Sequence, residues 1–205
     1  KNYLALFAKS FNWAGLFLPK KIYDDCSHLY AFCRVLDDIA DEKADLKTKI
    51  EKFNKMKSFF KNSFNLNNYD KNSSYENESI ILNIFAIAEK YKIKRIIIED
   101  LIDGVASDLK ERVRIRSVKD LLIYSYRVAG TVGLMMSKIL KVSDRRALKG
   151  AIDLGIAMQL TNIARDVVED KKMDREYIKP DFENIIATLK LAEMFYQSSF
   201  SSIQK

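Results

Sequence analysis

The chain is poor in the residues that interrupt helices or bind metals. Its 205 residues include only six glycines and two prolines, Pro19 and Pro180. Proline breaks the interior of a helix and glycine weakens it, so their scarcity favours long helices and argues against an all-β protein. Histidine occurs once, at His28, and cysteine twice. Zinc sites need more of these ligands, and a helical di-iron site needs Glu-x-x-His pairs, which the chain lacks.

Signals of several other protein classes are missing as well. There is no Gly-rich phosphate loop, which disfavours nucleotide hydrolysis, and no zinc-finger or RNA-binding signature accompanies the net charge of +7. No apolar run is long enough for a transmembrane helix, and no secretory signal is recognisable. The basic balance suits an anionic small molecule or an anionic membrane surface, and we expect no nucleic-acid partner.

The two cysteines, Cys26 and Cys33, lie seven residues apart on one predicted helix. Two helical turns separate them by about 10 Å, which is too far for a disulfide. We therefore expect buried thiols in a reducing compartment and a cytoplasmic protein.

Apolar residues recur at three- and four-residue steps along most of the chain, the spacing of amphipathic helices. The predicted helices span residues 20–42, 46–60, 80–91, 93–109, 118–140, 143–171 and 184–203. The stretch 61–79 is rich in Asn and Ser, lacks periodicity and is predicted to be a mobile loop. No stretch predicts a strand convincingly. We predict an all-α fold, a single domain of residues 1–205 with antiparallel helices around a central cavity.

The strongest chemical signal is a cluster of acids at the end of the first long helix, Asp37-Asp38-Ile39-Ala40-Asp41-Glu42. Asp37 and Asp41 are four residues apart, so their carboxylates share one helix face, where like charges repel. A divalent cation reverses that repulsion, and Mg²⁺ prefers carboxylate and water oxygens as ligands. The alternative is a solvated acidic helix end.

A second stripe of oxygen-bearing side chains combines Gln159, Asn162, Asp166 and Asp170, at spacings of three, four and four. Gln and Asn are costly inside a buried helix unless something satisfies them. Here they extend the acidic stripe toward the apolar end of the helix, as a metal-lined cleft with an apolar chamber requires. Chance spacing on a solvated helix is the alternative. Together the two helices predict facing metal clamps that hold a polyanion with Mg²⁺, or with Mn²⁺ in its place.

At these residues the sequence resembles the squalene/phytoene synthase family, trans-isoprenyl diphosphate synthases that join two prenyl diphosphates head to head. Three blocks carry the resemblance in the family's order and touch about residues 10–180. The first runs from Ser10-Phe11 to the acidic cluster. The second is Tyr124-Ser125-Tyr126-Arg127-Val128-Ala129-Gly130-Thr131-Val132-Gly133, and the third runs from Leu154 to Ile178.

The resemblance implies an isoprenoid-synthase-type helical bundle and a role for each matching residue. Mg²⁺ would be held by Asp37, Asp41, Asn162 and Asp166. The catalytic residues would be Asp37, Asp41, Asp166, Asp170 and Tyr177. The diphosphates and the reacting carbons would be bound by Ser10, Phe11, Tyr30, Arg34, Gln159, Arg165 and Arg175. The prenyl cavity would be lined by Tyr124, Val128, Ala129 and Val132.

Gly130 and Gly133 would let their helix bend around that cavity, and the alternative is that they permit close helix packing.

The function that the resemblance implies is a prenyltransferase of the phytoene synthase type. It would condense two geranylgeranyl diphosphates through a cyclopropyl diphosphate intermediate, with Mg²⁺ and without a reductant, in carotenoid biosynthesis. One alternative is a squalene-type or hopanoid-pathway synthase that uses farnesyl diphosphate. Another is a non-catalytic member that serves as a binding or assembly module. We expect a monomer or weak homo-oligomer with peripheral membrane contact, since the hydrocarbon product must leave into lipid.

The chain departs from the family pattern in two places. It passes almost directly from Lys179-Pro180 to Asp181-Phe182, where the family has some tens of residues before the next helix. It also stops at Lys205, whereas relatives continue through helices that close the cavity. We therefore expect a chain that is shortened internally and incomplete at its C-terminus.

Overall fold

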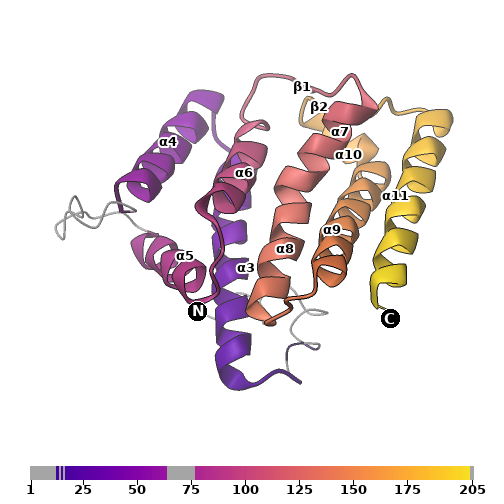
Figure 1. The fold of residues 1–205 in the computed structure, drawn as a ribbon. Coiled ribbons are helices and arrows are strands. Elements are labelled where there is room, and N and C mark those ends of the chain that lie inside the picture. The colour runs from indigo at the N-terminus through magenta and orange to yellow at the C-terminus, as the bar shows by residue number, and fades with distance from the viewer. Residues whose placement is uncertain (1–12, 14, 16, 64–76, 204–205) are drawn as a thin grey trace. The chain divides into compact units, whose positions relative to one another are not determined.

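The computed structural model describes residues 13, 15, 17–63 and 77–203. Ser10 and Phe11, which were predicted to bind substrate, lie outside the described residues. Two compact units make up the chain, divided between Lys94 and Arg95. The expectation of one domain over residues 1–205 stays a prediction. Helices dominate both units, which confirms the predicted all-α class (Figure 1).

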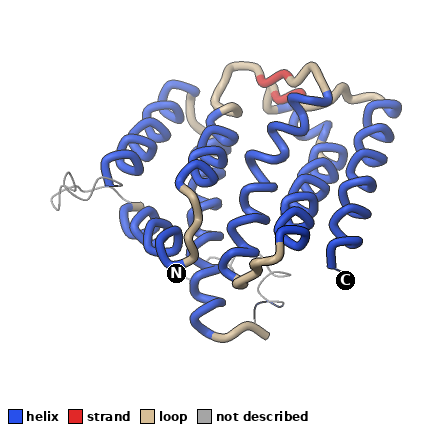
Figure 2. The backbone as a smooth tube through the Cα atoms, viewed as in Figure 1, coloured by secondary structure: helices blue, strands red, loops and turns tan. Residues whose placement is uncertain are grey.

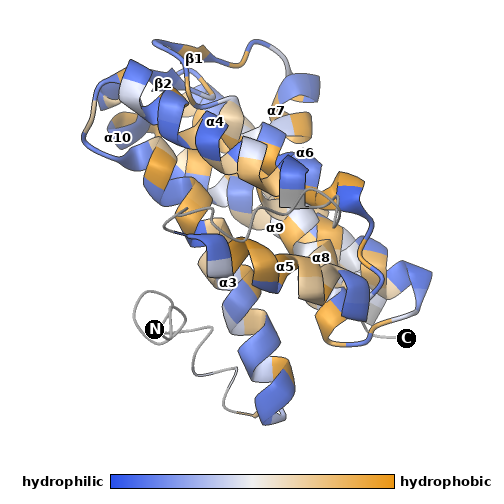
Figure 3. Cartoon of the chain, turned by 90° about the vertical axis from the view of Figure 1, so that its left-hand side faces the viewer, coloured by the Kyte–Doolittle hydropathy of each residue, from blue (hydrophilic) through white to orange (hydrophobic). Residues whose placement is uncertain are grey.

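The first unit consists of α3 (Lys20–Asp41), α4 (Leu46–Ser63) and α5 (Glu78–Lys90). Their apolar residues recur at helical spacing and are buried, among them Leu29 and Phe32 of α3. Figure 3 colours much of α5 as hydrophobic, as expected for a helix that packs against α3 and α4. The rings of Phe60 and Phe85 stack with their centroids 4.9 Å apart, which joins α4 to α5.

Both cysteines of α3 are free thiols, as predicted. Cys26 is buried and Cys33 is half-buried. Burial, with a smaller contribution from the charge of Asp25, raises the pKa of Cys26 to about 11. The thiol is therefore protonated and weakly reactive at neutral pH.

The second unit contains the remaining helices, a π-helical segment and two very short strands (Figure 2). Its elements are α6 (Arg95–Ala106), β1 (Val113–Arg114), α7 (Val118–Ser125), the π-helical segment (Tyr126–Gly130), α8 (Thr131–Ile139), α9 (Arg145–Arg165), α10 (Val167–Lys172), β2 (Arg175–Glu176) and α11 (Phe182–Ile203). None of the helices in the described part of the chain is long and apolar enough to cross a membrane.

The long helix α9 lies between α8 and α11 and packs against both (Figure 1). A buried carboxylate ties it to α11: Asp153 accepts hydrogen bonds from Ser198 Oγ at 2.6 Å and from Lys149 Nζ at 2.5 Å. This partnered charge satisfies the requirement that a buried carboxylate be hydrogen-bonded.

On its other side, α9 approaches α8 and the π-helical segment backbone to backbone. A Cβ atom added at Gly133 would lie 2.2 Å from the carbonyl oxygen of Ala151. One added at Gly155 would lie 2.4 Å from the carbonyl oxygen of Ala129. The alternative of close helix packing therefore holds for Gly133, because no side chain fits in that space.

The π-helical segment interrupts what the sequence predicts as one α-helix over residues 118–140. The Thr131 N–H bonds to the carbonyl of Tyr126, five residues earlier, while its hydroxyl donates to the carbonyl of Arg127 at 2.7 Å. The side chain of Thr131 thus occupies the acceptor that its own N–H would take in an α-helix.

Three further features differ from the sequence predictions. Two strands form, where none was convincing, and β1 pairs with β2 in parallel. The helix predicted over 143–171 breaks at Asp166, between α9 and α10. Helices cover both ends of the loop predicted over 61–79, since α4 extends to Ser63 and α5 starts at Glu78; residues 64–76 lie outside the described part.

Replacing Gly133 with alanine tests the backbone contact between α8 and α9. We expect Gly133→Ala to lower the free energy of unfolding by about 1–3 kcal/mol, because its Cβ meets a backbone carbonyl that cannot swing aside. Gly130→Ala is the matched control, since its Cβ would meet only side chains at 3.1 Å or more. Urea unfolding followed by circular dichroism measures both, and equal losses would contradict the tight contact at Gly133.

Candidate functional site

In the first unit, the predicted site residues form one stripe along the second half of α3. Tyr30, Arg34, Asp37 and Asp41 follow at spacings of four, three and four, which places them on a single helix face. Tyr30 and Arg34 are half-buried, whereas Asp37 and Asp41 are exposed. The stripe therefore passes from a packed aromatic ring to solvent-facing carboxylates.

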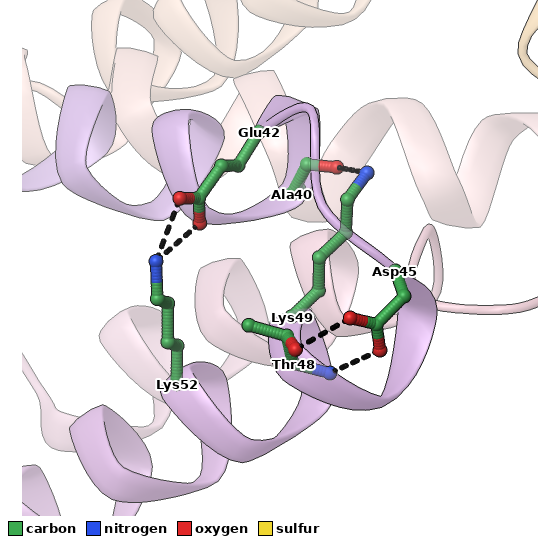
Figure 4. Close-up of polar contacts among 6 residues, drawn as sticks. All are labelled: Ala40, Glu42, Asp45, Thr48, Lys49 and Lys52. Atoms are coloured by element: carbon green, nitrogen blue, oxygen red, sulfur yellow. Dashed lines mark hydrogen bonds and ion pairs between the residues drawn. The ribbon is translucent and has the colours of Figure 1, made fainter.

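The other two acids of the cluster are neutralised by nearby cations. Asp38 pairs with Arg34 at 2.6 Å, one helical turn away. Lys52 Nζ in α4 donates to both carboxylate oxygens of Glu42, each at 2.6 Å, as Figure 4 shows. Lys49 of α4 donates to the carbonyl of Ala40 at 3.1 Å, in the last turn of α3. These lysines offset the negative end of the helix dipole, which disfavours carboxylates at a helix C-terminus.

The turn that follows α3 is itself fixed by a short polar motif. Asp45 accepts from the Thr48 N–H at 2.9 Å and from the Thr48 hydroxyl at 2.7 Å (Figure 4). The Asp45 carboxylate thereby caps the first turn of α4. The hydrogen bonds from the Thr48 hydroxyl and N–H lower the pKa of Asp45. Because α4 starts in this defined position, its lysines reach back to the end of α3.

The charges on this stripe act on the aromatic ring above them. Burial raises the pKa of Tyr30, the nearby Arg34 lowers it, and the Asp37 carboxylate raises it further. Tyr30 is therefore a neutral phenol at physiological pH.

In the second unit, the polar stripe of α9 continues through the break at Asp166. Gln159, Asn162, Asp166 and Asp170 are all half-buried. The Asp166 N–H bonds to the carbonyl of Asn162, and the Asp170 N–H bonds to the carbonyl of Asp166, each at 2.8 Å. Helical hydrogen bonding therefore persists across the break, so the four side chains keep their predicted common direction.

Arg165 holds the carboxylate of Asp166 in a bidentate contact. Its Nε and one terminal nitrogen each lie 2.6 Å from a carboxylate oxygen. This hydrogen bonding lowers the pKa of Asp166 below its usual value. Asp166 is thus ionised at neutral pH, as a metal ligand must be.

Two predicted site residues from distant parts of the chain meet in the core of the second unit. The rings of Tyr124 and Tyr177 stack with centroids 4.8 Å apart, and their hydroxyl oxygens lie 3.1 Å from each other. They share a hydrophobic cluster with Leu160 and Ile163 of α9. Tyr177 is therefore placed beside the predicted cavity-lining Tyr124 rather than in solvent.

Asp108 joins this pair, and the sequence reading did not single it out. Its two carboxylate oxygens accept from the Tyr124 hydroxyl at 2.8 Å and from the Tyr177 hydroxyl at 2.9 Å. Burial, followed by the charge of Asp108, raises the pKa of both tyrosines. The available signal was that the acidic Asp108 lies between the apolar Val105, three residues before it, and Leu109, directly after it. An acid so close to buried apolar residues is unusual for a solvated loop.

The remaining predicted residues lie near this core. Val128 packs against the cluster that contains Tyr124, and Ala129 meets α9 at Gly155. Val132, in the first turn of α8, and Arg175, in β2, are half-buried. The described part of the second unit thus gathers Tyr124, Val128, Tyr177 and the α9 stripe around one packed region.

Metal binding was predicted at four of these residues. Among the described residues, no group of three or more His, Cys, Asp or Glu side chains is close enough to hold a metal ion. Each stripe instead offers a few oxygen donors: Asp37 and Asp41 in the first unit, and Asn162, Asp166 and Asp170 in the second. Sparse oxygen donors fit Mg²⁺, which keeps several water ligands and is completed by substrate phosphates.

Comparison with known proteins places the chain in a family. Residues 4–180 match the family model described as squalene/phytoene synthase. The chain is 36% identical over 179 residues to a 15-cis-phytoene synthase of Paracoccus sp. (strain N81106 / MBIC 01143), covering 85% of this chain and 57% of that protein. It is 34% identical over 173 residues to a phytoene synthase of Rhodobacter capsulatus, covering 84% of this chain and 49% of that protein. The chain thus spans about half the length of these curated relatives.

Two solved structures share the fold. A dehydrosqualene synthase in complex with a ligand has a TM-score of 0.68 and 27% sequence identity, covering 98% of this chain and 74% of that one. The squalene synthase HpnC from Alicyclobacillus acidocaldarius has a TM-score of 0.70 and 18% identity, covering 96% and 77%. The predicted helical fold is therefore confirmed, and the chain belongs to the squalene/phytoene synthase family.

Proposed function

We propose that the protein to which this chain belongs condenses two geranylgeranyl diphosphates head to head, through a cyclopropyl diphosphate intermediate, to phytoene. It would thus be a Mg²⁺-dependent prenyltransferase of carotenoid biosynthesis. The observation that carries the proposal is the retention of both acidic sets in a chain 34–36% identical to bacterial phytoene synthases. A non-catalytic binding module has no need of them.

The oxygen donors of the two stripes would hold the metal. Asp37 and Asp41 supply exposed carboxylates, and Asp166 supplies an ionised carboxylate beside Asn162, with Asp170 one turn further on. When bound, Mg²⁺ would neutralise the diphosphate leaving group and so favour ionisation of the allylic C–O bond.

The arginines beside these acids would bind the diphosphates. Arg34 and Arg165 each lie against a carboxylate of the acidic sets, at Asp38 and Asp166 respectively. Arg175 follows in β2. Guanidinium groups bind phosphate oxygens in a bidentate manner, which orients the leaving group as well as offsetting its charge. Ser10, Phe11, Tyr30 and Gln159 are proposed to complete the contacts with substrate.

Tyr124 and Tyr177 are suited to the wall of a pocket that contains a carbocation. Aromatic faces stabilise cations. A phenolate would instead trap the cation covalently, and the raised pKa of both tyrosines keeps them as neutral phenols. Asp108 is therefore proposed as a positioning residue that fixes both rings through their hydroxyl groups.

A second candidate substrate is farnesyl diphosphate. The structural likeness to a dehydrosqualene synthase at 27% identity supports it, since that enzyme belongs to the same fold. We further propose that the protein is a cytoplasmic monomer or weak homo-oligomer that contacts membranes peripherally. We also propose that Mn²⁺ can replace Mg²⁺ at its metal sites.

The decisive assay incubates the protein with geranylgeranyl or farnesyl diphosphate, with Mg²⁺ or with EDTA, and identifies the extracted hydrocarbon by chromatography. We expect phytoene from geranylgeranyl diphosphate, formed only with Mg²⁺. Asp37→Asn and Asp166→Asn should each lower turnover by about a hundred-fold or more, because each removes an anionic ligand without changing side-chain size.

Glu169→Gln is the matched control, since this exposed acid lies beside Asp170 but outside the stripe. Its turnover should equal that of the unaltered protein. A product from farnesyl diphosphate alone would transfer the assignment to the squalene-type enzymes. The binding-module alternative would be supported if the chain bound the substrates without metal and without turnover. The same result would have to be found for a full-length relative that carries the aspartates of both stripes.

Asp108→Asn tests the positioning role. An amide keeps the size of the side chain but offers one acceptor oxygen, so one buried hydroxyl loses its acceptor and the free energy of unfolding falls by about 1–3 kcal/mol.

In the unaltered protein, the raised pKa values of both tyrosines predict a contribution to stability that is full below about pH 10. This contribution is lost as the pH rises through the folded-state pKa values. Phenolate absorbance and urea unfolding measure both effects.

Glu111→Gln, an exposed neutralisation three residues away, serves as the control. In Asp108→Asn the tyrosine pKa values should fall, because the charge of Asp108 is removed. They should stay above the usual value, because both tyrosines remain buried. Unchanged alkaline titration and unchanged stability in Asp108→Asn would refute the role assigned to this carboxylate.

A further inference from the structure

A concave pocket in the second unit is lined by an unusual concentration of basic side chains. It has a volume of about 390 Å³ and lies between the segment after α6, the run through β1, and α7. Its charged lining residues are Lys110, Arg112, Arg114, Arg116, Arg127 and Asp120. We propose that this arginine pocket binds the phosphate or diphosphate group of a small molecule.

Three of these arginines lie in or next to β1: Arg114 belongs to the strand, and Arg112 and Arg116 lie two residues to either side of Arg114. The N–H of Val113 bonds to the carbonyl of Asp174, and that of Ile115 to the carbonyl of Glu176, each at 3.0 Å. This pairing holds residues 113–115 extended, and alternate side chains of an extended chain share one face. Arg114 and Arg116, on either side of Ile115, therefore follow one another at about 7 Å. Together with Arg112, which lies in a bend just before β1, they form a row of arginines in the lining of the pocket.

Little within the described residues neutralises this row. Arg112, Arg114, Arg116 and Lys110 are exposed, and none forms an ion pair or a hydrogen bond with another described side chain. Arg127 has a long ion pair with Asp100, at 3.8 Å. The mutual repulsion of these cations is relieved when an anion binds among them.

The one carboxylate of the lining is already engaged. Asp120 accepts from the Ser117 hydroxyl at 2.6 Å, while its own N–H donates back to that hydroxyl at 3.1 Å. This reciprocal contact caps α7 at its first turn. Asp120 therefore stabilises the helix start rather than pairing with the arginines.

The shape of the pocket favours a small ligand over a membrane surface. Its floor includes Val113 and Tyr124, which are both buried, so the anion enters a hollow rather than meeting a protruding face. Planar guanidinium groups bind phosphate oxygens in pairs and provide geometric selectivity that point charges lack. The pocket shares Tyr124 with the proposed prenyl cavity, but none of the residues proposed to hold Mg²⁺ lines it, so the inference adds an anion site to the proposed function.

Calorimetric titration with inorganic diphosphate in EDTA tests the pocket, because metal-assisted binding at the acidic stripes is then suppressed. We expect binding that weakens about ten-fold or more in the double variant Arg114→Gln/Arg116→Gln. The matched control is Arg145→Gln/Arg146→Gln, which removes the same charge from exposed arginines at the start of α9. That control should retain the affinity of the unaltered protein.

A third variant separates charge from geometry and guards against misfolding. Arg114→Lys/Arg116→Lys keeps both charges but loses bidentate contacts, so its affinity should lie between those of the unaltered protein and the glutamine variant. Circular dichroism verifies that each variant is folded.

Three results would overturn the proposal. Equal weakening in both glutamine double variants would reduce the binding to overall charge. Loss of binding in Arg165→Gln, but not in Arg114→Gln/Arg116→Gln, would locate the anion at the proposed catalytic stripe and leave the proposed function intact. Binding to phosphatidylglycerol vesicles through Arg114 and Arg116, without any affinity for diphosphate, would identify a membrane contact instead.

Discussion

The approach of α9 to the preceding helix depends on the absence of side chains at two points. Gly133 and Gly155 each face a backbone carbonyl at a distance that excludes a Cβ atom. With the backbones in contact, the buried residues of α9 reach the same core as Tyr124 and Tyr177. The polar stripe of α9 begins beside these core residues, so the glycine contacts determine where its amide and carboxylate groups lie relative to the tyrosine pair.

Local signals predicted much of this arrangement. The bounds of α3 and α11 differ from the prediction by one or two residues, since apolar spacing marks them plainly. The two stripes also followed from spacing alone. The β1–β2 pairing and Asp108 were missed because each depends on partners remote in sequence. The π-helical segment was missed because the apolar spacing around it is that of an ordinary helix. Asp108 lies 69 residues before Tyr177, and no local pattern encodes that contact.

The basic excess of the chain takes two forms. At the ends of α3 and α9, arginines and lysines contact carboxylates in ion pairs that remain open to solvent. The Arg165 and Asp166 side chains, for example, are 66% and 37% exposed. Such pairs contribute little to stability. Each charged group can therefore leave its partner and bind a ligand with little loss of stability. In the described part of the chain, Arg112, Arg114 and Arg116 form no such ion pairs, so their charge is available without rearrangement.

The π-helical segment also determines which face of α8 is turned toward α9. It holds one residue more than an α-helix needs to span the same turn, and the Thr131 hydroxyl stabilises that excess. If the same residues formed a regular α-helix instead, the additional residue would rotate α8 by about 100° relative to α7. Gly133 would then turn away from Ala151. The π-helical turn over Tyr126–Gly130 therefore keeps Gly133 directed at α9, although the segment contains one residue more than an α-helical turn.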